Sequence, residues 1–144
     1  MDEFDVLKLE NQLCFPLYAA SREVIKRYRP HLDALDLTYT QYVTMMLLWE
    51  HRVLSVKELG RRLYLDSGTL TPVLKSLEAK GLISRTRSEA DERVLLAKLT
   101  PDGEALRGRA AEVPGRVAAC VGLRPEEAAQ LHGLLYRLLG SLQA

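Results

Sequence analysis

The stretch SVKELGRRLYLDSGTLTPVLKSLEAKGLISRTRSEADERVLLAKL, from Ser55 to Leu99, decides the fold. Its start, Ser55-Val56-Lys57-Glu58, has the serine-to-glutamate spacing of a capping box and predicts the first turn of a helix. Asp66 and Ser67 then offer cap oxygens to a second helix. Apolar residues recur in that helix at i, i+3, i+4 and i+7, and Gly81 is expected to end it. They are Leu70, Val73, Leu74 and Leu77.

Two further segments complete this stretch. Residues 82–87 and 93–99 alternate enough to pair as strands, and the polar residues 88–92 are expected to form the tip between them. Helix, short turn, helix and hairpin in this order predict a winged helix-turn-helix. The plainer alternative is a helical hairpin that packs against the rest of the chain and binds nothing.

The outward face of the second helix is expected to carry small hydroxyl residues and one cation, namely Thr69, Thr71, Lys75 and Ser76. A helix without bulk on this face can lie close in a DNA major groove, while a basic hairpin reaches the neighbouring minor groove. We expect Asp91 to orient Arg93 in that hairpin. The residues expected to contact the major groove are Ser67, Thr69, Thr71 and Lys75.

The charge of the chain is unevenly distributed. The net charge of its 144 residues is only +1, but residues 52–93 hold 9 basic and 6 acidic side chains, or +3, whereas residues 1–51 hold 5 and 8, or −3. The positive excess therefore lies where phosphate contacts are expected. Because an excess of +3 is modest, we expect two copies to bind DNA together.

Length and composition indicate one globular domain. Apolar residues make up 47% and charged residues 27%, and no apolar run approaches the roughly 20 residues of a membrane span. The acidic start MDEFD is unlike a signal peptide, so we expect a cytoplasmic protein that does not contact membranes. His31, His51 and His132 are scattered, so neither a metal site nor another cofactor is expected.

Helices are predicted on both sides of the winged segment. The first covers about residues 11–35, with Pro16 tolerated in its first turn and Pro30 expected to interrupt or end it. Its apolar stripe consists of Leu13, Leu17, Val24 and Tyr28. Thr38 and Gln41 form a second capping box, which opens a buried helix through Trp49.

After the wing, a helix is expected from residue 101 to about 120 with a kink at 114–115, and Pro125 opens a last, Leu-rich helix. The fold class is thus mainly α with a small β-hairpin wing (α+β), in a single domain over residues 1–144. Residues 52–99 form the DNA-binding lobe, and residues 5–36 and 101–144 supply dimerisation helices. A twofold homodimer reads an inverted repeat. Alternatively, the flanking apolar faces fold back on their own subunit.

Two sets of motifs carry a resemblance to a known family. The broader one is Leu77-Glu78-x-x-Gly81-Leu82-Ile83-x-Arg85 with Asp91-Glu92-Arg93 and Leu99-Thr100-x-x-Gly103; the narrower one is Asn11-Gln12-Leu13-Cys14-Phe15 with Leu63-Tyr64-Leu65-Asp66-Ser67-Gly68-Thr69-Leu70-Thr71-Pro72. The chain resembles the MarR family of winged-helix repressors, and within it the OhrR subfamily that senses organic hydroperoxides. The resemblance implies a repressor, not an enzyme, whose reduced dimer binds DNA.

Cys14 has two interpretations. A lone cysteine in apolar surroundings is commonly an inert core residue, but one in a helix's first turn has its thiolate favoured by free N–H groups. Tyr28 shares its helical face but lies 14 residues away, roughly 21 Å along a straight helix, so the two cannot touch within one chain. The OhrR resemblance implies that Tyr28 and Tyr39 of the partner subunit hydrogen-bond Cys14, the peroxidatic residue.

Cys120 is either a small residue that fills helix packing or a resolving thiol that condenses with oxidised Cys14. The resemblance to two-cysteine OhrR proteins implies the second role, across the dimer, with organic hydroperoxide as inducer and a thiol peroxidase as the controlled gene product. Three other functions stay open: a MarR-type repressor relieved by a phenolic ligand or another oxidant, a thiol peroxidase using Cys14, and a dimerisation module that does not bind DNA.

Overall fold

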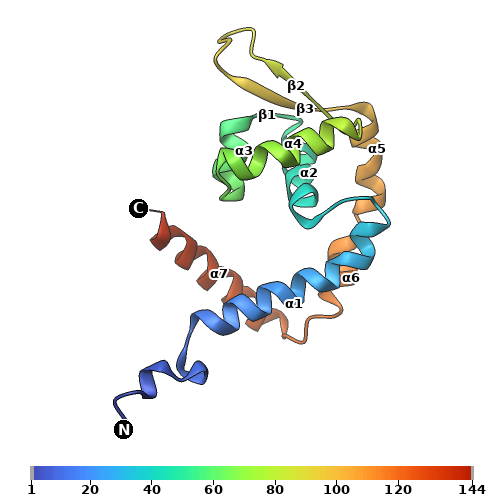
Figure 1. The fold of residues 1–144 in the computed structure, drawn as a ribbon. Helices are drawn as coiled ribbons and strands as arrows, with labels where there is room; N and C mark the ends of the chain where they lie inside the picture. Colours follow the sequence, from blue (N-terminus) through green and yellow to red (C-terminus); the bar gives the residue numbers. More distant parts are fainter. Residues whose placement is uncertain (1, 144) are drawn as a thin grey trace.

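The computed structural model describes residues 2–143, which fold into a winged lobe and a set of long flanking helices (Figure 1). Two short 3-10 turns, η1 (Asp5–Leu7) and η2 (Leu9–Asn11), precede the helices α1 (Cys14–Asp33) and α2 (Tyr39–His51). The winged lobe follows, with β1 (Val53–Ser55), α3 (Val56–Leu63), α4 (Ser67–Ala79), β2 (Ile83–Arg87) and β3 (Leu95–Leu99). The chain ends with α5 (Pro101–Ala110), α6 (Val113–Ala118) and α7 (Pro125–Leu142).

Helix α1 starts at Cys14, a few residues after the predicted start near residue 11, with Pro16 in its first turn. The expectation that Pro30 interrupts or ends the helix is wrong. The helix continues through Pro30 to Asp33. Pro30 removes one helical hydrogen bond close to the helix end, and Leu32, only 2% exposed, anchors the last turn in the core. The chain then reverses at Asp36, whose φ of 55° lies in the left-handed region.

The predicted caps form at α2 and α4. Thr38 Oγ1 accepts a hydrogen bond from the Gln41 amide (3.3 Å), and Gln41 Oε1 accepts one from the Thr38 amide (3.1 Å), which confirms the capping box. Only half of the box predicted at α3 exists. Ser55 Oγ accepts from the Glu58 amide (3.0 Å), but the Glu58 carboxylate binds the two arginines that follow it on α3.

The sheet has one strand more than the sequence predicts. The wing strands β2 and β3 pair antiparallel from Ile83 opposite Leu99 to Arg87 opposite Leu95, as expected. The short strand β1 adds to the other edge of β3, which gives the order β1-β3-β2. This pairing ties the start of α3 to the base of the wing, so the two parts of the lobe hold each other in place.

Leucine is the commonest residue of the core, to which the sheet adds Ile83 and Ala97. Met45, Leu48, Leu59 and Leu77 are fully buried. The indole of Trp49 donates a hydrogen bond to the Gly103 carbonyl (2.8 Å) and so fastens α2 to the first turn of α5. The predicted kink near residue 114 appears as a break between α5 and α6.

The flanking helices leave their apolar faces uncovered in the single chain. Leu13 is 80% exposed and Leu134 58%, and α7 has no buried residue at all. In Figure 1, the first half of α1 extends away from the winged lobe, whereas α7 turns back so that its C-terminal end lies near α3. The exposed leucines of these faces are therefore not covered by their own subunit. None of the helices described over residues 2–143 has both the length and the apolar character to cross a membrane.

Candidate DNA-binding and redox sites

Helix α4 presents the residues predicted to enter a major groove. Asp66 caps the helix, its Oδ1 accepting a hydrogen bond from the Thr69 amide (2.7 Å), and this bond holds the pKa of the carboxyl below its usual value. Ser67, Thr69 and Lys75 are exposed and Thr71 is half-buried. The Thr71 hydroxyl donates its proton to the Ser67 carbonyl (2.7 Å). Thr71 Oγ1 can therefore only accept a hydrogen bond from a base, and the Thr71 methyl group can contact the methyl group of thymine.

Ser76 does not belong to this outward face. Its hydroxyl accepts a hydrogen bond from Gln41 Nε2 (2.9 Å), at the contact between α2 and α4. The sequence grouping of Ser76 with Thr69, Thr71 and Lys75 is therefore wrong. A residue between the buried Leu74 and Leu77 lies near the boundary of the two faces, where periodicity alone does not decide the direction.

The tip of the wing presents one guanidinium to solvent. Asp91 accepts hydrogen bonds from Nε and Nη2 of Arg93 (both 3.1 Å) and from the Arg93 amide (3.0 Å). This pairing lowers the pKa of Asp91 and raises that of Arg93, whose side chain is 87% exposed. The structure thus gives Asp91 the orienting position that the sequence predicts.

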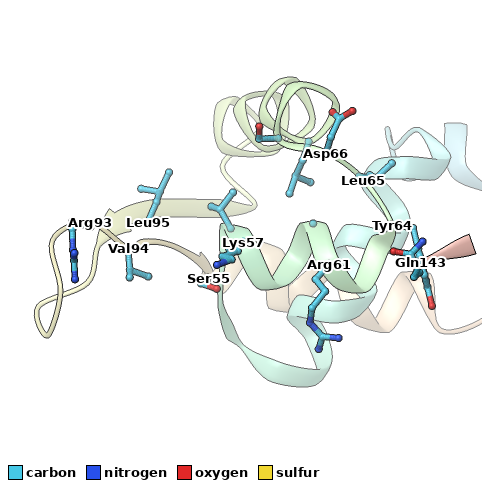
Figure 2. A pocket seen from close by; sticks show the side chains of 14 residues that line it. Ser55, Lys57, Arg61, Tyr64, Leu65, Asp66, Arg93, Val94, Leu95 and Gln143 are labelled. Atoms are coloured by element: carbon cyan, nitrogen blue, oxygen red, sulfur yellow. The ribbon is translucent and has the colours of Figure 1, made fainter. Parts of the chain in front are cut away.

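A groove connects the recognition helix α4 to the wing (Figure 2). It lies between α3, the start of α4 and the first residues of β3. Lys57 and Arg61 on α3 and Arg93 on the wing line it. Sequence reasoning did not single out Lys57 and Arg61, although their spacing of four residues on an exposed helix face is a signal for a basic edge. Arg61 is partly neutralised by Glu58, to which its Nε donates (2.9 Å).

Cys14 is the first residue of α1, with an exposed and unbridged thiol. The helix runs without a break past Tyr28, so the 14 residues between them correspond to about 21 Å along its axis. Within one chain, Cys14 therefore lies far from Tyr28.

Three tyrosines pack together where α1 meets the start of α2, and we call Tyr28, Tyr39 and Tyr42 the tyrosine cluster. The rings of Tyr28 and Tyr39 meet edge to face with centroids 5.0 Å apart, and Tyr42 lies 5.8 Å from Tyr28. Burial raises the pKa of Tyr39 and of Tyr42, so both phenols keep their protons at neutral pH and can donate hydrogen bonds. Tyr18 lies apart, against the guanidinium of Arg22.

Cys120 follows the end of α6 and is also exposed and unbridged, with its Sγ 3.6 Å from the Arg116 carbonyl oxygen. Arg116 borders the same cavity as Pro30 and His31 near the end of α1. Cys120 therefore lies toward the C-terminal end of α1, whereas Cys14 is at its N-terminus.

Comparison with known proteins decides the family. The sequence pattern of the MarR family matches residues 37–95. The organic hydroperoxide resistance transcriptional regulator of Bacillus subtilis is 53% identical over 141 residues, which cover 98% of this chain and 96% of that protein. The chain belongs to the MarR family.

Solved structures agree with this assignment. The chain is similar to reduced AbfR bound to DNA, with a TM-score of 0.81 and 33% identity over 99% of this chain and 100% of that one. Disulfide-formed AbfR gives a TM-score of 0.66 at 34% identity, over 92% of this chain and 93% of that one. This MarR protein is a winged-helix transcriptional regulator, and its chain has the shape of the reduced, DNA-bound relative more closely than that of the disulfide form.

Proposed function

We propose that the protein is a redox-sensing repressor, whose reduced homodimer binds an inverted-repeat operator and is released when an organic hydroperoxide oxidises Cys14. One observation carries the proposal: an exposed thiol and a cluster of protonated phenols lie at opposite ends of one unbroken helix whose apolar face is uncovered. The Bacillus subtilis relative, named for organic hydroperoxide resistance, supports the choice of oxidant.

The DNA-binding half of the proposal concerns the lobe of residues 52–99. Ser67, Thr69, Thr71 and Lys75 would contact base edges and phosphates in the major groove, and Arg93 would enter the minor groove in the orientation that Asp91 gives it. We assign Lys57 to the DNA backbone, because it lines the groove between α3 and the wing. The sequence-specific residues all lie on α4.

The dimer half concerns residues 5–36 and 101–144, whose uncovered leucines need a partner surface. If the two α1 helices cross antiparallel, the N-terminus of each lies beside the C-terminal half of the other. Cys14 of one subunit then approaches Tyr28 and Tyr39 of its partner. Phenol hydroxyls that donate to the sulfur stabilise the thiolate, which is the reactive form.

The chemical steps follow from this site. The Cys14 thiolate attacks one peroxide oxygen, the O–O bond breaks, and the alcohol leaves after taking up a proton, so Cys14 becomes a sulfenic acid. The Cys120 thiol of the partner subunit then attacks this sulfur. An S–S bond forms, the S–O bond breaks, and water leaves.

Release of DNA would follow from the geometry of the dimer. A twofold dimer reads two half-sites when its recognition helices are one helical turn apart, about 34 Å. A disulfide between the start of α1 and the end of α6 rearranges the flanking helices that set this spacing. The lower similarity of the chain to disulfide-formed AbfR than to reduced AbfR supports such a rearrangement.

The decisive experiment is a titration of DNA from upstream of the protein's own gene with wild type and Cys14→Ser, each with and without near-stoichiometric organic hydroperoxide and then dithiothreitol. We expect wild-type affinity to fall with peroxide and to return with the thiol, while Cys14→Ser ignores both. Binding that ignores peroxide in both proteins would leave a repressor with another inducer, such as a phenolic ligand.

Three variants test the finer steps. A band of dimer size on a non-reducing gel should appear after peroxide in wild type and be absent in Cys120→Ser. Tyr28→Phe and Tyr39→Phe should slow oxidation of Cys14, measured by trapping its sulfenic acid. Unchanged rates in both phenylalanine variants would remove the tyrosines from the site.

A further inference from the structure

We propose that Gln41 couples the tyrosine cluster to the recognition helix α4, so that a change at the redox site reaches the DNA-binding surface through its side-chain amide. The inference rests on the proposed function and adds a positioning residue to it. Gln41 is only 7% exposed, and its side-chain amide bonds to three residues, Thr38 at the start of α2 and Ser76 and Lys80 at the end of α4.

The hydrogen bonds of this amide fix its orientation. Gln41 Oε1 accepts from the Thr38 amide (3.1 Å) and from Lys80 Nζ (3.0 Å), while Nε2 donates to Ser76 Oγ (2.9 Å). A flipped amide would set its NH₂ group against two donors, so only one orientation satisfies all three partners. The side chain thus ties the start of α2 to the last turn of α4.

On the redox side, Gln41 is part of the turn that carries the tyrosine cluster. Tyr39 and Tyr42 flank it on α2, and Thr38, to which it bonds, is the cap that starts this helix. A displacement of the Tyr39 backbone toward a partner's sulfur would therefore also move the capping box. The side chain that closes the box is the same one that bonds to Ser76.

On the DNA side, Ser76 lies in the last turn of α4 and Lys80 is the residue that caps its C-terminus. Lys80 Nζ also donates to the Asp36 carbonyl, at the residue with positive φ between α1 and α2. Over residues 2–143, the side-chain hydrogen bonds that join the α1–α2 segment to α4 and its capping Lys80 all involve Gln41 or Lys80. The remaining contact between α2 and α4 is apolar and does not specify an orientation in the same way.

If Gln41 lost these partners while it stayed buried, its amide would carry a desolvation penalty that no hydrogen bond offsets, so the buried side chain favours the bonded arrangement. Reduced protein would keep the three bonds and hold α4 in the orientation described here. Oxidation that pulls Tyr39 away would release the end of α4. Variants that lack these bonds should therefore bind DNA more weakly when reduced and lose less affinity on oxidation than wild type does.

The experiment compares the ratio of DNA dissociation constants, oxidised over reduced, in wild type and four variants on the upstream duplex. Gln41→Leu removes all three bonds and Ser76→Ala removes the one to α4. Gln41→Glu keeps two acceptor oxygens for Thr38 and Lys80 and can accept from the Ser76 hydroxyl. Thr44→Val is the matched control, because Thr44 is buried on the same helix but donates only to the Thr40 carbonyl (2.8 Å).

We expect the ratio to fall by roughly threefold or more in Gln41→Leu and Ser76→Ala, and to stay at the wild-type value in Gln41→Glu and Thr44→Val. Sulfenic acid formation at Cys14 should be the same in all five proteins. If Gln41→Leu does not fold, Ser76→Ala decides. Wild-type ratios in Ser76→Ala, or an equal loss in Thr44→Val, would overturn the coupling. A wild type that ignores peroxide would overturn the proposed function as well, so the two failures are distinguished by the wild-type measurement.

Discussion

Replacing Gly103 with alanine tests whether α5 is seated on the base of the wing as described. A Cβ at this position would lie 2.2 Å from the Leu82 carbonyl oxygen and 2.8 Å from a methyl carbon of Leu99. Carbon and oxygen approach no closer than about 3.3 Å in comfortable contacts, so the two backbones must separate by about 1 Å. The Leu82 carbonyl has little freedom to move, since it accepts a hydrogen bond from the Thr100 amide (3.1 Å).

The magnitude follows from this clash. Overpacking costs about 1–3 kcal/mol, and two backbone segments in conflict place Gly103→Ala at the upper end. The matched control is Gly108→Ala on the same helix, where an added Cβ meets nothing within 4 Å. This control should gain up to about 1 kcal/mol from helix propensity. The two variants should therefore differ by about 3 kcal/mol in free energy of unfolding.

Urea unfolding at one protein concentration measures this difference, because dimerisation makes stability depend on concentration. With a slope of about 2 kcal/mol per molar urea, the midpoints should lie roughly 1.5 M apart, with Gly103→Ala the lower. Equal midpoints for the two variants would refute the seating of α5 against Leu82. A lower midpoint in Gly108→Ala would refute the exposed position of that residue.

Three further predictions concern charge and protonation. Arg93→Ala should weaken DNA binding and reduce the dependence of log affinity on log salt by about one per subunit, and an unchanged slope in filter-binding titrations would exclude the wing from the interface. The pKa values of Tyr39 and Tyr42 are raised by burial, so the stability from these groups is complete below about pH 10 and is lost as pH rises through their folded-state values. Ultraviolet titration should show two of the six tyrosines ionising later than the others, which simultaneous ionisation of all six would contradict. Asp66→Ala should lower helix content and DNA affinity while Asp66→Asn retains both, as circular dichroism and titration can check, since asparagine also caps helices.

The fold of the winged lobe could be predicted from sequence because the signals for its elements are local. The cap at Asp66, the apolar repeat of α4 and the stop at Gly81 each depend on a few neighbouring residues, and all three form as predicted. Strand β1 was missed, since three residues carry no periodicity and its partner lies more than 40 positions away. The helix end beyond Pro30 depends on burial of Leu32, which no local pattern contains.

The candidate sites could also be predicted only where their residues are close in the sequence. Asp91 and Arg93 are two positions apart in the sequence, so their pairing could be predicted. The bond between Gln41 and Ser76 spans 35 residues, and it reverses the direction that helix periodicity gives to Ser76. The redox site is harder still to predict from local sequence patterns, because Cys14 and Tyr28 cannot meet within one chain.

The unbroken course of α1 has a consequence for mixtures of defective chains. When the thiol and its phenols come from different subunits, a Cys14→Ser chain and a Tyr28→Phe chain paired in one dimer form two unlike sites. One site combines the intact Cys14 with the intact Tyr28, and the other has lost both. Such a heterodimer, made from two chains that fail as homodimers, should regain half of its sites and respond to peroxide again.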